Sequence, residues 1–191
     1  SGWGYLVQAQ NFDCGFGSLG HDSAERTREN QDPASCLGQN HSDSFATGEF
    51  AVWGTVTGSH IATYDSDGTY QSITEALWGL NPETRYSTLE HRWSFTLPSS
   101  SAFELHVEGY RSDSLDWDSF EFAYSMDGGS EWHPVPLSPL PLSDEGIDLV
   151  APLPSTLTGT VLLRVIDTNR GLGYQPLDTV TIDQLFVRSI P

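Results

Sequence analysis

The sequence predicts an all-β protein, an antiparallel β-sandwich of the jelly-roll type with a long disulfide-stapled N-terminal loop. Short runs alternate apolar with polar residues, as in Phe-Glu-Leu-His-Val at 103–107 and Val-Leu-Leu-Arg-Val at 161–165. This period of two is typical of half-buried strands. Glycine, aspartate and proline separate the runs, and no window of helical length has an apolar stripe with a period of 3.6 residues.

The expected strands follow one another along the chain from residue 49. They are residues 49–57, 59–64, 70–78, 88–96, 103–110, 119–125, 160–166 and 179–187. The segment 134–154 contains six prolines and is expected to form a surface loop or an edge connection, because proline cannot donate to a central ladder. With 191 residues, we expect a single β-sandwich domain over 1–191, with 51–191 as its core.

Residues 1–50 form the expected N-terminal part of that domain. Residues 3–12 predict a strand with Tyr5, Val7 and Ala9 on one face. Residues 13–46 have almost no aliphatic periodicity and include both cysteines. An irregular segment of this length is uncommon and is usually functional.

Cys14 and Cys36 are predicted to form a disulfide. A bridge that closes this loop stabilises a fold by about 3 kcal/mol, mainly by restricting the unfolded chain. The alternative is a zinc site with His21 and His41, but this ligand spacing matches no common zinc finger. A disulfide indicates an oxidising compartment, so we expect a secreted, extracellular protein.

The charge of the chain excludes several classes of partner. Its formal net charge is −18, from 26 acidic and 8 basic residues, and every basic residue is arginine. Nucleic acid and anionic lipid both require basic surfaces, so neither is an expected partner. The absence of lysine excludes Schiff-base and phosphate-loop lysine chemistry. No apolar run is long enough to insert into a membrane.

Acidic residues predict calcium binding. Asp116 and Asp118 precede an expected strand that ends at Asp127-Gly128, a dipeptide typical of tight hairpins. Carboxylates at the ends of strands are the usual ligands of Ca²⁺. We predict a structural Ca²⁺ site, and a second one is possible; the alternative is that these side chains cap turns. The candidate ligands are Asp116, Asp118, Asp178, Asp167 and Asp183 for the first site, and Asp65, Asp67 and Glu75 for the second.

Aromatic residues predict a binding surface. The six tryptophans and seven tyrosines are many for this length, and exposed aromatic faces can stack on a ligand. We expect Trp93 in the core, and Trp78, Trp117 and Tyr174 as ligand-binding residues. The alternative is ordinary core and edge packing.

Several motifs occur in the order found in a β-sandwich accessory module of secreted bacterial proteins. They span about residues 53–187 and comprise 57–59, 70–75, 85–95, 110–132, 164–170 and 177–183. In this part the chain resembles carbohydrate-binding and adhesion modules, which are non-catalytic parts of larger proteins. The resemblance implies a jelly-roll sandwich that binds polysaccharide or another glycan. Residues 1 to about 50 depart from the pattern.

Catalytic motifs are weak, and we predict that the chain is not an enzyme. Gly-Phe-Gly-Ser-Leu-Gly at 15–20 has no βαβ context, and Glu90-His91 lacks the second histidine of a zinc protease. The predicted function is a calcium-stabilised, non-catalytic extracellular binding module for carbohydrate. The alternative is a self-assembling subunit of a filament, sheath or adhesive layer, in which the strand at 3–12 completes a neighbour's sheet.

Overall fold

The computed structural model describes residues 10–11, 15–16, 41–113, 119–173 and 176–191. The chain divides into two compact units, residues 1–41 and 42–191. In the first unit, β1 (Gln10–Asn11) pairs antiparallel with β2 (Gly15–Phe16). The predicted disulfide between Cys14 and Cys36 lies outside the described residues, as do residues 3–9 and 12 of the strand expected at 3–12.

The second unit contains a six-stranded antiparallel sheet with the order β13-β10-β15-β6-β5, and β3 also pairs with β15. Its long central strands β10 and β15 provide most of its pairing. The bounds are β3 Ser42–Phe45, β5 Thr55–Thr57, β6 Gln71–Thr74, β10 Ala102–Arg111, β13 Asp148–Leu153 and β15 Thr179–Ile190.

A five-stranded antiparallel sheet has the order β12-β11-β14-β9-β4. Strands β4 and β12 form its two edges. The bounds are β4 Gly48–Trp53, β9 Glu90–Leu97, β11 Phe120–Ser125, β12 His133–Pro134 and β14 Gly159–Asp167. The predicted all-β class with antiparallel sheets is therefore confirmed.

The core lies between the two sheets. Alternate residues of each sheet point inward and form one cluster of buried side chains, as expected for strands with one face on the core. Trp93 is completely buried, as predicted. The six-stranded sheet contributes Ile73, Phe103, Leu105, Val107 and Ile182, and the five-stranded sheet contributes Phe95, Val161, Leu163 and Val165.

Two positions in the sandwich require glycine. Gly54 has φ of 108°, a conformation that favours glycine, and it lies where the chain leaves β4 of one sheet and enters β5 of the other. Gly109 lies at a register shift between β10 and β15. A Cβ atom there would lie 2.4 Å from the carbonyl oxygen of Thr181, so no larger residue fits this β-bulge.

The structure corrects several expected boundaries. The prediction of a strand at 59–64 is wrong, because His60–Thr63 form a 3-10 helix, η2. The expected run 49–57 divides into β4 and β5, and 70–78 divides into β6 and β7 (Ala76–Trp78). The sandwich begins at Ser42 rather than at residue 51. Part of the proline-rich segment forms β13, an edge strand that tolerates Pro152.

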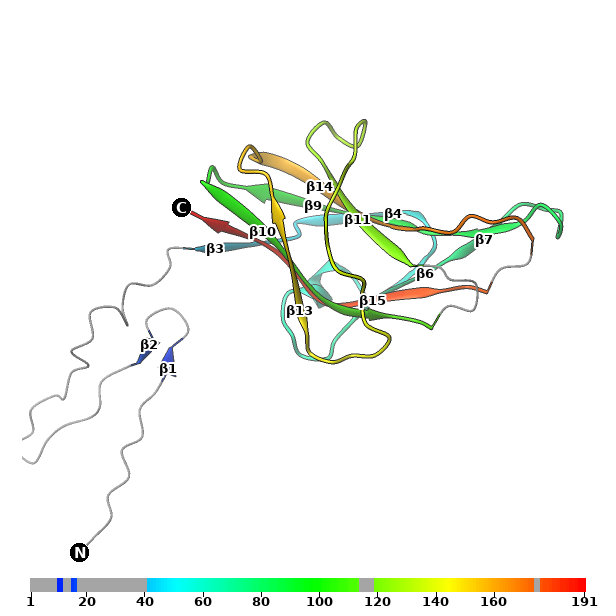
Figure 1. Cartoon of the computed structure of the whole chain (residues 1–191), viewed down its shortest axis with the longest axis horizontal. Helices are drawn as coiled ribbons and strands as arrows, with labels where there is room; N and C mark the ends of the chain where they lie inside the picture. Colours follow the sequence, from blue (N-terminus) through cyan, green and yellow to red (C-terminus); the bar gives the residue numbers. More distant parts are fainter. Residues whose placement is uncertain (1–9, 12–14, 17–40, 114–118, 174–175) are drawn as a thin grey trace, which may run out of the picture. The chain divides into compact units, whose positions relative to one another are not determined.

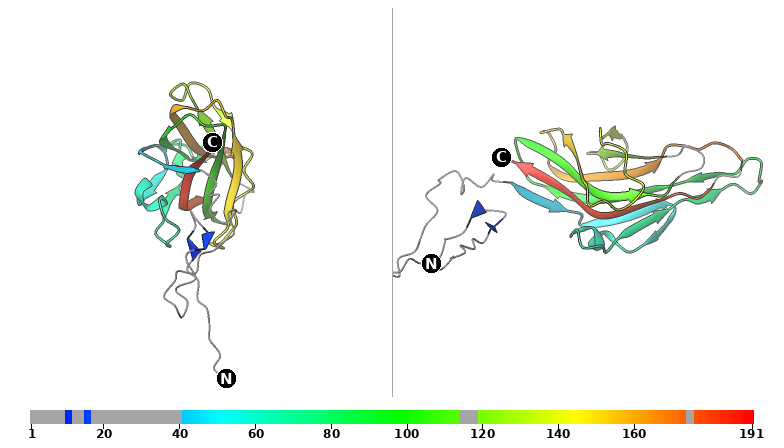
Figure 2. Two further views of the ribbon diagram at one scale, coloured as in Figure 1. Left: turned by 90° about the vertical axis from the view of Figure 1, so that its left-hand side faces the viewer. Right: turned by 60° about the horizontal axis from the view of Figure 1, so that its bottom comes forward.

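A hairpin of β7 and β8 (Tyr86–Thr88) forms a separate two-stranded sheet. It projects from the end of the sandwich opposite to the end at which β15 reaches the C-terminus (Figures 1 and 2). No helix in the described part of the chain is long and apolar enough to cross a membrane.

Candidate ligand-binding face

On the outer face of the six-stranded sheet, side chains from neighbouring strands pack against one another. The ring of His106 stacks on Phe186 with centroids 4.4 Å apart, and Phe186 also contacts Phe45. Arg188 donates two hydrogen bonds of 2.8 Å to Asp43. Because His106 and Phe186 are buried, this face leaves little aromatic surface for a ligand.

The outer face of the five-stranded sheet is different. Phe50 on β4 lies opposite Arg92 on β9, and Arg92 lies opposite Arg164 on β14. Arg164 in turn lies opposite Ala123 on β11. This lateral row therefore crosses four strands. Phe50 is 64% exposed at the edge of the sheet, so its ring is available to a ligand.

Trp132 lies against both arginines of this row. The guanidinium carbon of Arg164 is 4.3 Å from the centroid of the Trp132 ring, and that of Arg92 is 5.1 Å away. Both distances are within the range of a cation–π interaction. We call Arg92, Trp132 and Arg164 the Arg–Trp–Arg stack.

The loop at residues 126–132 places Trp132 in the stack. Asp127 accepts hydrogen bonds from the backbone N–H groups of Ser130 and Glu131 and from the hydroxyl of Ser125. The bond from Glu131 is the largest cause of a lowered pKa at Asp127, and the bond from Ser125 follows. A Cβ atom on Gly129 would lie 3.2 Å from the Trp132 ring, so the loop lies close to the stack. The hairpin predicted at Asp127-Gly128 forms between β11 and β12, but its loop comprises residues 126–132 and is longer than a tight turn.

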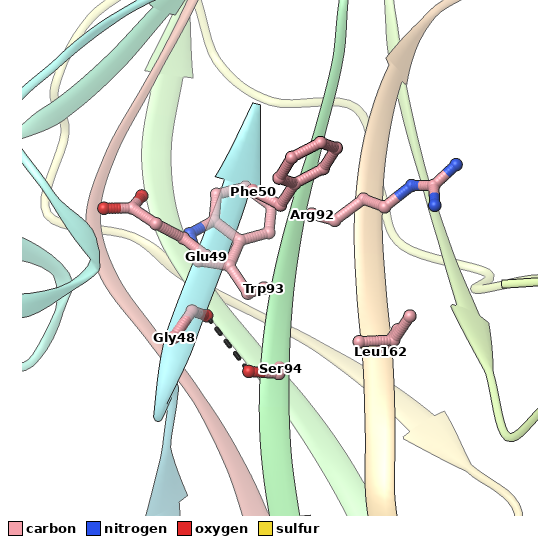
Figure 3. A pocket seen from close by; sticks show the side chains of 7 residues that line it. All are labelled: Gly48, Glu49, Phe50, Arg92, Trp93, Ser94 and Leu162. Atoms are coloured by element: carbon pink, nitrogen blue, oxygen red, sulfur yellow. Dashed lines mark hydrogen bonds between the residues drawn. The ribbon is translucent and has the colours of Figure 1, made fainter. Parts of the chain in front are cut away.

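A shallow depression of about 370 Å³ includes Arg92 of the stack in its lining, together with Phe50 and Leu162 (Figure 3). Phe50 and Arg92 lie on the same side of the sheet in Figure 3, with Leu162 on the neighbouring strand. The hydroxyl of Ser94 donates a hydrogen bond of 3.4 Å to the carbonyl of Gly48. The lining of the depression therefore combines an exposed aromatic ring with the side chain of Arg92.

Beneath this face, a partly buried polar network joins the two sheets. The carboxylate of Glu49 accepts hydrogen bonds from the backbone N–H of His60 and from the side-chain amide of Gln71, and it lies 3.1 Å from Nε2 of His91. Gln71 also accepts a hydrogen bond of 2.7 Å from Nε1 of Trp93. This network was not predictable from the sequence, because its members come from four separate segments.

Two side chains of this network, His91 and Glu49, have shifted pKa values. Burial lowers the pKa of His91, although the nearby Glu49 carboxylate opposes the shift. Burial acts to raise the pKa of Glu49, but the hydrogen bonds from Gln71 and His60 outweigh it, so this pKa lies below its ordinary value. His91 is therefore neutral and Glu49 ionised at neutral pH, which is typical of a structural pair.

We expect acid to destabilise the fold through His91. Because its folded-state pKa is lowered, the unfolded chain binds the proton more tightly, so stability is present above about pH 6.5 and is lost as pH falls through the folded pKa. Binding of one such proton changes the free energy of unfolding by at most about 1.4 kcal/mol per pH unit. In thermal melts between pH 7.5 and 5, His91→Gln should lose less stability than the wild type. Equal pH slopes for both proteins would contradict this assignment.

Three of the predicted calcium ligands, Asp167, Asp178 and Asp183, lie in the described part of the chain, and each has its own partners there. Asp116 and Asp118 lie outside the described residues. Asp167 accepts a hydrogen bond of 2.8 Å from the backbone N–H of Leu89 and faces Arg170. Asp183 accepts the N–H of Gly68, and burial is the largest cause of its raised pKa. Asp178 is buried and accepts a hydrogen bond from the hydroxyl of Ser112.

The second predicted group, Asp65, Asp67 and Glu75, is not brought together as a metal centre. Asp65 and Asp67 are exposed on the loop after η2, and Asp67 accepts the N–H of Thr69. Glu75 is buried and accepts the N–H of Asp178. Within the ranges that the structure describes, no three histidine, cysteine or acidic side chains are grouped so as to hold a metal ion.

Of the predicted aromatic residues, the structure describes Trp78. Its side chain is 49% exposed on β7 and lies 5.4 Å from the ring of Tyr86. Leu77, Asn81 and Thr84 line a depression beside it. Trp117 and Tyr174 lie outside the described residues. Sequence reasoning missed Phe50 and Trp132, since only the pairing of β4 with β9 and the loop at 126–132 bring them to one face.

Comparisons with known proteins give little further information. No family model matches the chain, and no curated protein matches it. One similar solved structure is TmCBM61 in complex with β-1,4-galactotriose, at 11% identity and a TM-score of 0.39. The match covers 78% of this chain and 87% of that chain. A likeness at this level supports no conclusion about the ligand of this protein.

Proposed function

We propose that the chain is a non-catalytic, secreted binding module for a glycan, built on a jelly-roll sandwich. The observation behind the proposal is the open face formed by Phe50, the Arg–Trp–Arg stack and the depression beside them. Consecutive strands from β9 to β11 and from β13 to β15 alternate between the sheets, which is consistent with the jelly-roll description.

The chemistry of this face suits a sugar. A sugar ring presents apolar C–H groups on its faces and hydroxyls around its rim. An exposed aromatic ring can cover the faces, and planar guanidinium groups can donate paired hydrogen bonds to the rim. A few placed polar groups beside apolar surface are typical of small-ligand sites.

Affinity electrophoresis tests the proposal directly. The full chain is run through native gels that contain one soluble glycan each, with a panel of plant, algal and bacterial polysaccharides and with bovine serum albumin as reference. We expect retardation by at least one glycan. Unchanged mobility in every gel, together with no pull-down by insoluble glycans, would overturn the proposed function.

We also propose a structural Ca²⁺ held by Asp178 together with Asp116 and Asp118. Asp178 supports the proposal because its carboxylate is buried and its Oδ2 atom has no hydrogen-bond partner among the described residues. Its other oxygen accepts from Ser112, shortly before the segment that contains Asp116 and Asp118. Bound Ca²⁺ would neutralise two of the three carboxylate charges and tie Asp178 to the segment that contains Asp116 and Asp118.

Removal of calcium should therefore destabilise the protein. At 100 times its dissociation constant, a bound ion adds about 2.7 kcal/mol, which corresponds to about 5–10 °C in Tm for a domain of this size. We expect EDTA to lower the Tm by this amount and added Ca²⁺ to restore it. Asp178→Asn should melt at the same temperature with and without EDTA. A wild-type Tm that EDTA leaves unchanged would rule out the calcium proposal.

A second candidate function is self-assembly through the strand predicted at residues 3–12. The observation that favours it is that β4 is an edge strand with exposed Phe50 and Trp53, since an open edge can accept a strand from another chain. Light scattering distinguishes the two functions. A full-length chain that stays monomeric at high concentration in millimolar Ca²⁺ would exclude assembly and leave glycan binding untouched.

A further inference from the structure

The Arg–Trp–Arg stack concentrates positive charge in a very acidic protein. The chain has eight basic residues against a net charge of −18, yet two of the eight, Arg92 and Arg164, lie directly opposite each other on neighbouring strands. Like charges in this position destabilise a sheet. Their placement therefore needs a compensating partner.

The described part of the chain provides incomplete compensation. Glu90 is the one acidic side chain there within ion-pair distance of both guanidiniums, at 2.6 Å from Arg92 and 3.8 Å from Arg164. Nε of Arg164 is buried and has no hydrogen-bond partner among the described residues. Burial lowers the pKa of Arg164, Glu90 opposes this, and Arg92 and Arg170 lower the pKa further. The stack is thus short of one negative charge.

We infer that this face recognises an anionic glycan, whose carboxylate or sulfate group binds the guanidinium groups of Arg92 and Arg164 while a sugar ring contacts Phe50. The inference rests on the proposed glycan-binding function and names the ligand class for the same site. Guanidinium groups bind carboxylate and sulfate-like anions through paired, charge-assisted hydrogen bonds. The bound anion would supply the charge that Glu90 alone does not.

The overall negative charge does not prevent such binding. At physiological ionic strength the Debye length is about 8 Å, so distant carboxylates are screened and the charges next to the site decide. Nucleic acid is a different case, because its closely spaced phosphates require a continuous track of basic residues. One arginine pair fits an anion on an individual sugar unit instead.

Matched pairs of glycans test the inference in 0.15 M salt. The probes are polygalacturonate against its fully methyl-esterified form, and a sulfated galactan against the same galactan after desulfation. We expect retardation by the charged member of at least one pair and weak or no retardation by its neutral counterpart. The pair that responds identifies carboxylate or sulfate as the recognised group.

The outcomes separate the two proposals. Equal binding of charged and neutral members, or binding of neutral glycans alone, overturns the anionic ligand and leaves glycan binding standing. No binding by any glycan overturns both.

Two arginine variants test whether Arg92 and Arg164 bind the anionic group of the glycan. Arg164→Gln and Arg92→Gln should each weaken binding of the charged glycan about tenfold or more, because each removes hydrogen bonds from a charged donor. Arg188→Gln is the matched control, since Arg188 is held by Asp43 on the other sheet, and it should bind like the wild type. Thermal melts confirm that each variant folds. If folded Arg92 and Arg164 variants both keep wild-type affinity, the inference fails.

Discussion

Trp93→Ala should lower the free energy of unfolding by about 3–5 kcal/mol, the usual cost of removing a large buried aromatic side chain. Trp93 is completely buried on β9 and belongs to the core between the sheets. The substitution also leaves the side-chain oxygen of Gln71 without the donor at Nε1 of Trp93, which adds the cost of an unsatisfied buried acceptor. For a domain of this size the Tm should fall by about 10 °C or more.

Denaturant unfolding followed by circular dichroism measures this effect. Trp78→Ala is the matched control, because Trp78 is half exposed on the β7–β8 hairpin and contributes little core burial. It should cost less than about 1 kcal/mol, since surface substitutions usually have small effects. Similar losses for Trp93→Ala and Trp78→Ala would contradict the described core.

Phe50→Ala should weaken glycan binding by about tenfold or more while the fold keeps its stability. Phe50 is 64% exposed, so its removal costs little burial on folding. In a complex the same ring would be covered by a sugar, and buried aromatic anchors usually dominate binding energy. Isothermal titration with a retained glycan gives the affinity, and a thermal melt gives the stability.

Two further variants make the titration decisive. Val150→Ala removes an exposed apolar side chain on β13 of the six-stranded sheet, away from the proposed ligand row, so it should bind like the wild type. Trp78→Ala tests the aromatic residue that sequence reasoning favoured. If Trp78→Ala loses affinity and Phe50→Ala does not, the glycan binds at the β7–β8 hairpin rather than on the five-stranded sheet.

The fold class was predictable because strand periodicity is local. Alternation at residues 103–107 and 161–165 identified β10 and β14, and no helical stripe competed with them. The points at which an expected strand is interrupted were harder to predict from the sequence. Gly54 divides β4 from β5 through its positive φ, β3 is a short and mostly polar strand, and β13 lies within the proline-rich segment.

The candidate binding face was less predictable because it depends on register. Phe50, Arg92 and Arg164 lie far apart in sequence, and only the pairing of β4 with β9 and of β9 with β14 places them in one row. Trp132 joins them through the loop at 126–132. Aromatic composition predicted a binding surface, but the sequence favoured Trp78, which lies on β7 and pairs with Tyr86 of β8 instead of joining this row.

Backbone NMR shifts on titration with a retained glycan test the central claim, that the outer face of the five-stranded sheet binds the ligand. The amide signals of Phe50, Arg92, Arg164 and the loop at 126–132 should shift together and saturate with one affinity, while those of β10 and β13 stay constant. Shifts confined to the β7–β8 hairpin, or spread over the six-stranded sheet, would contradict the account.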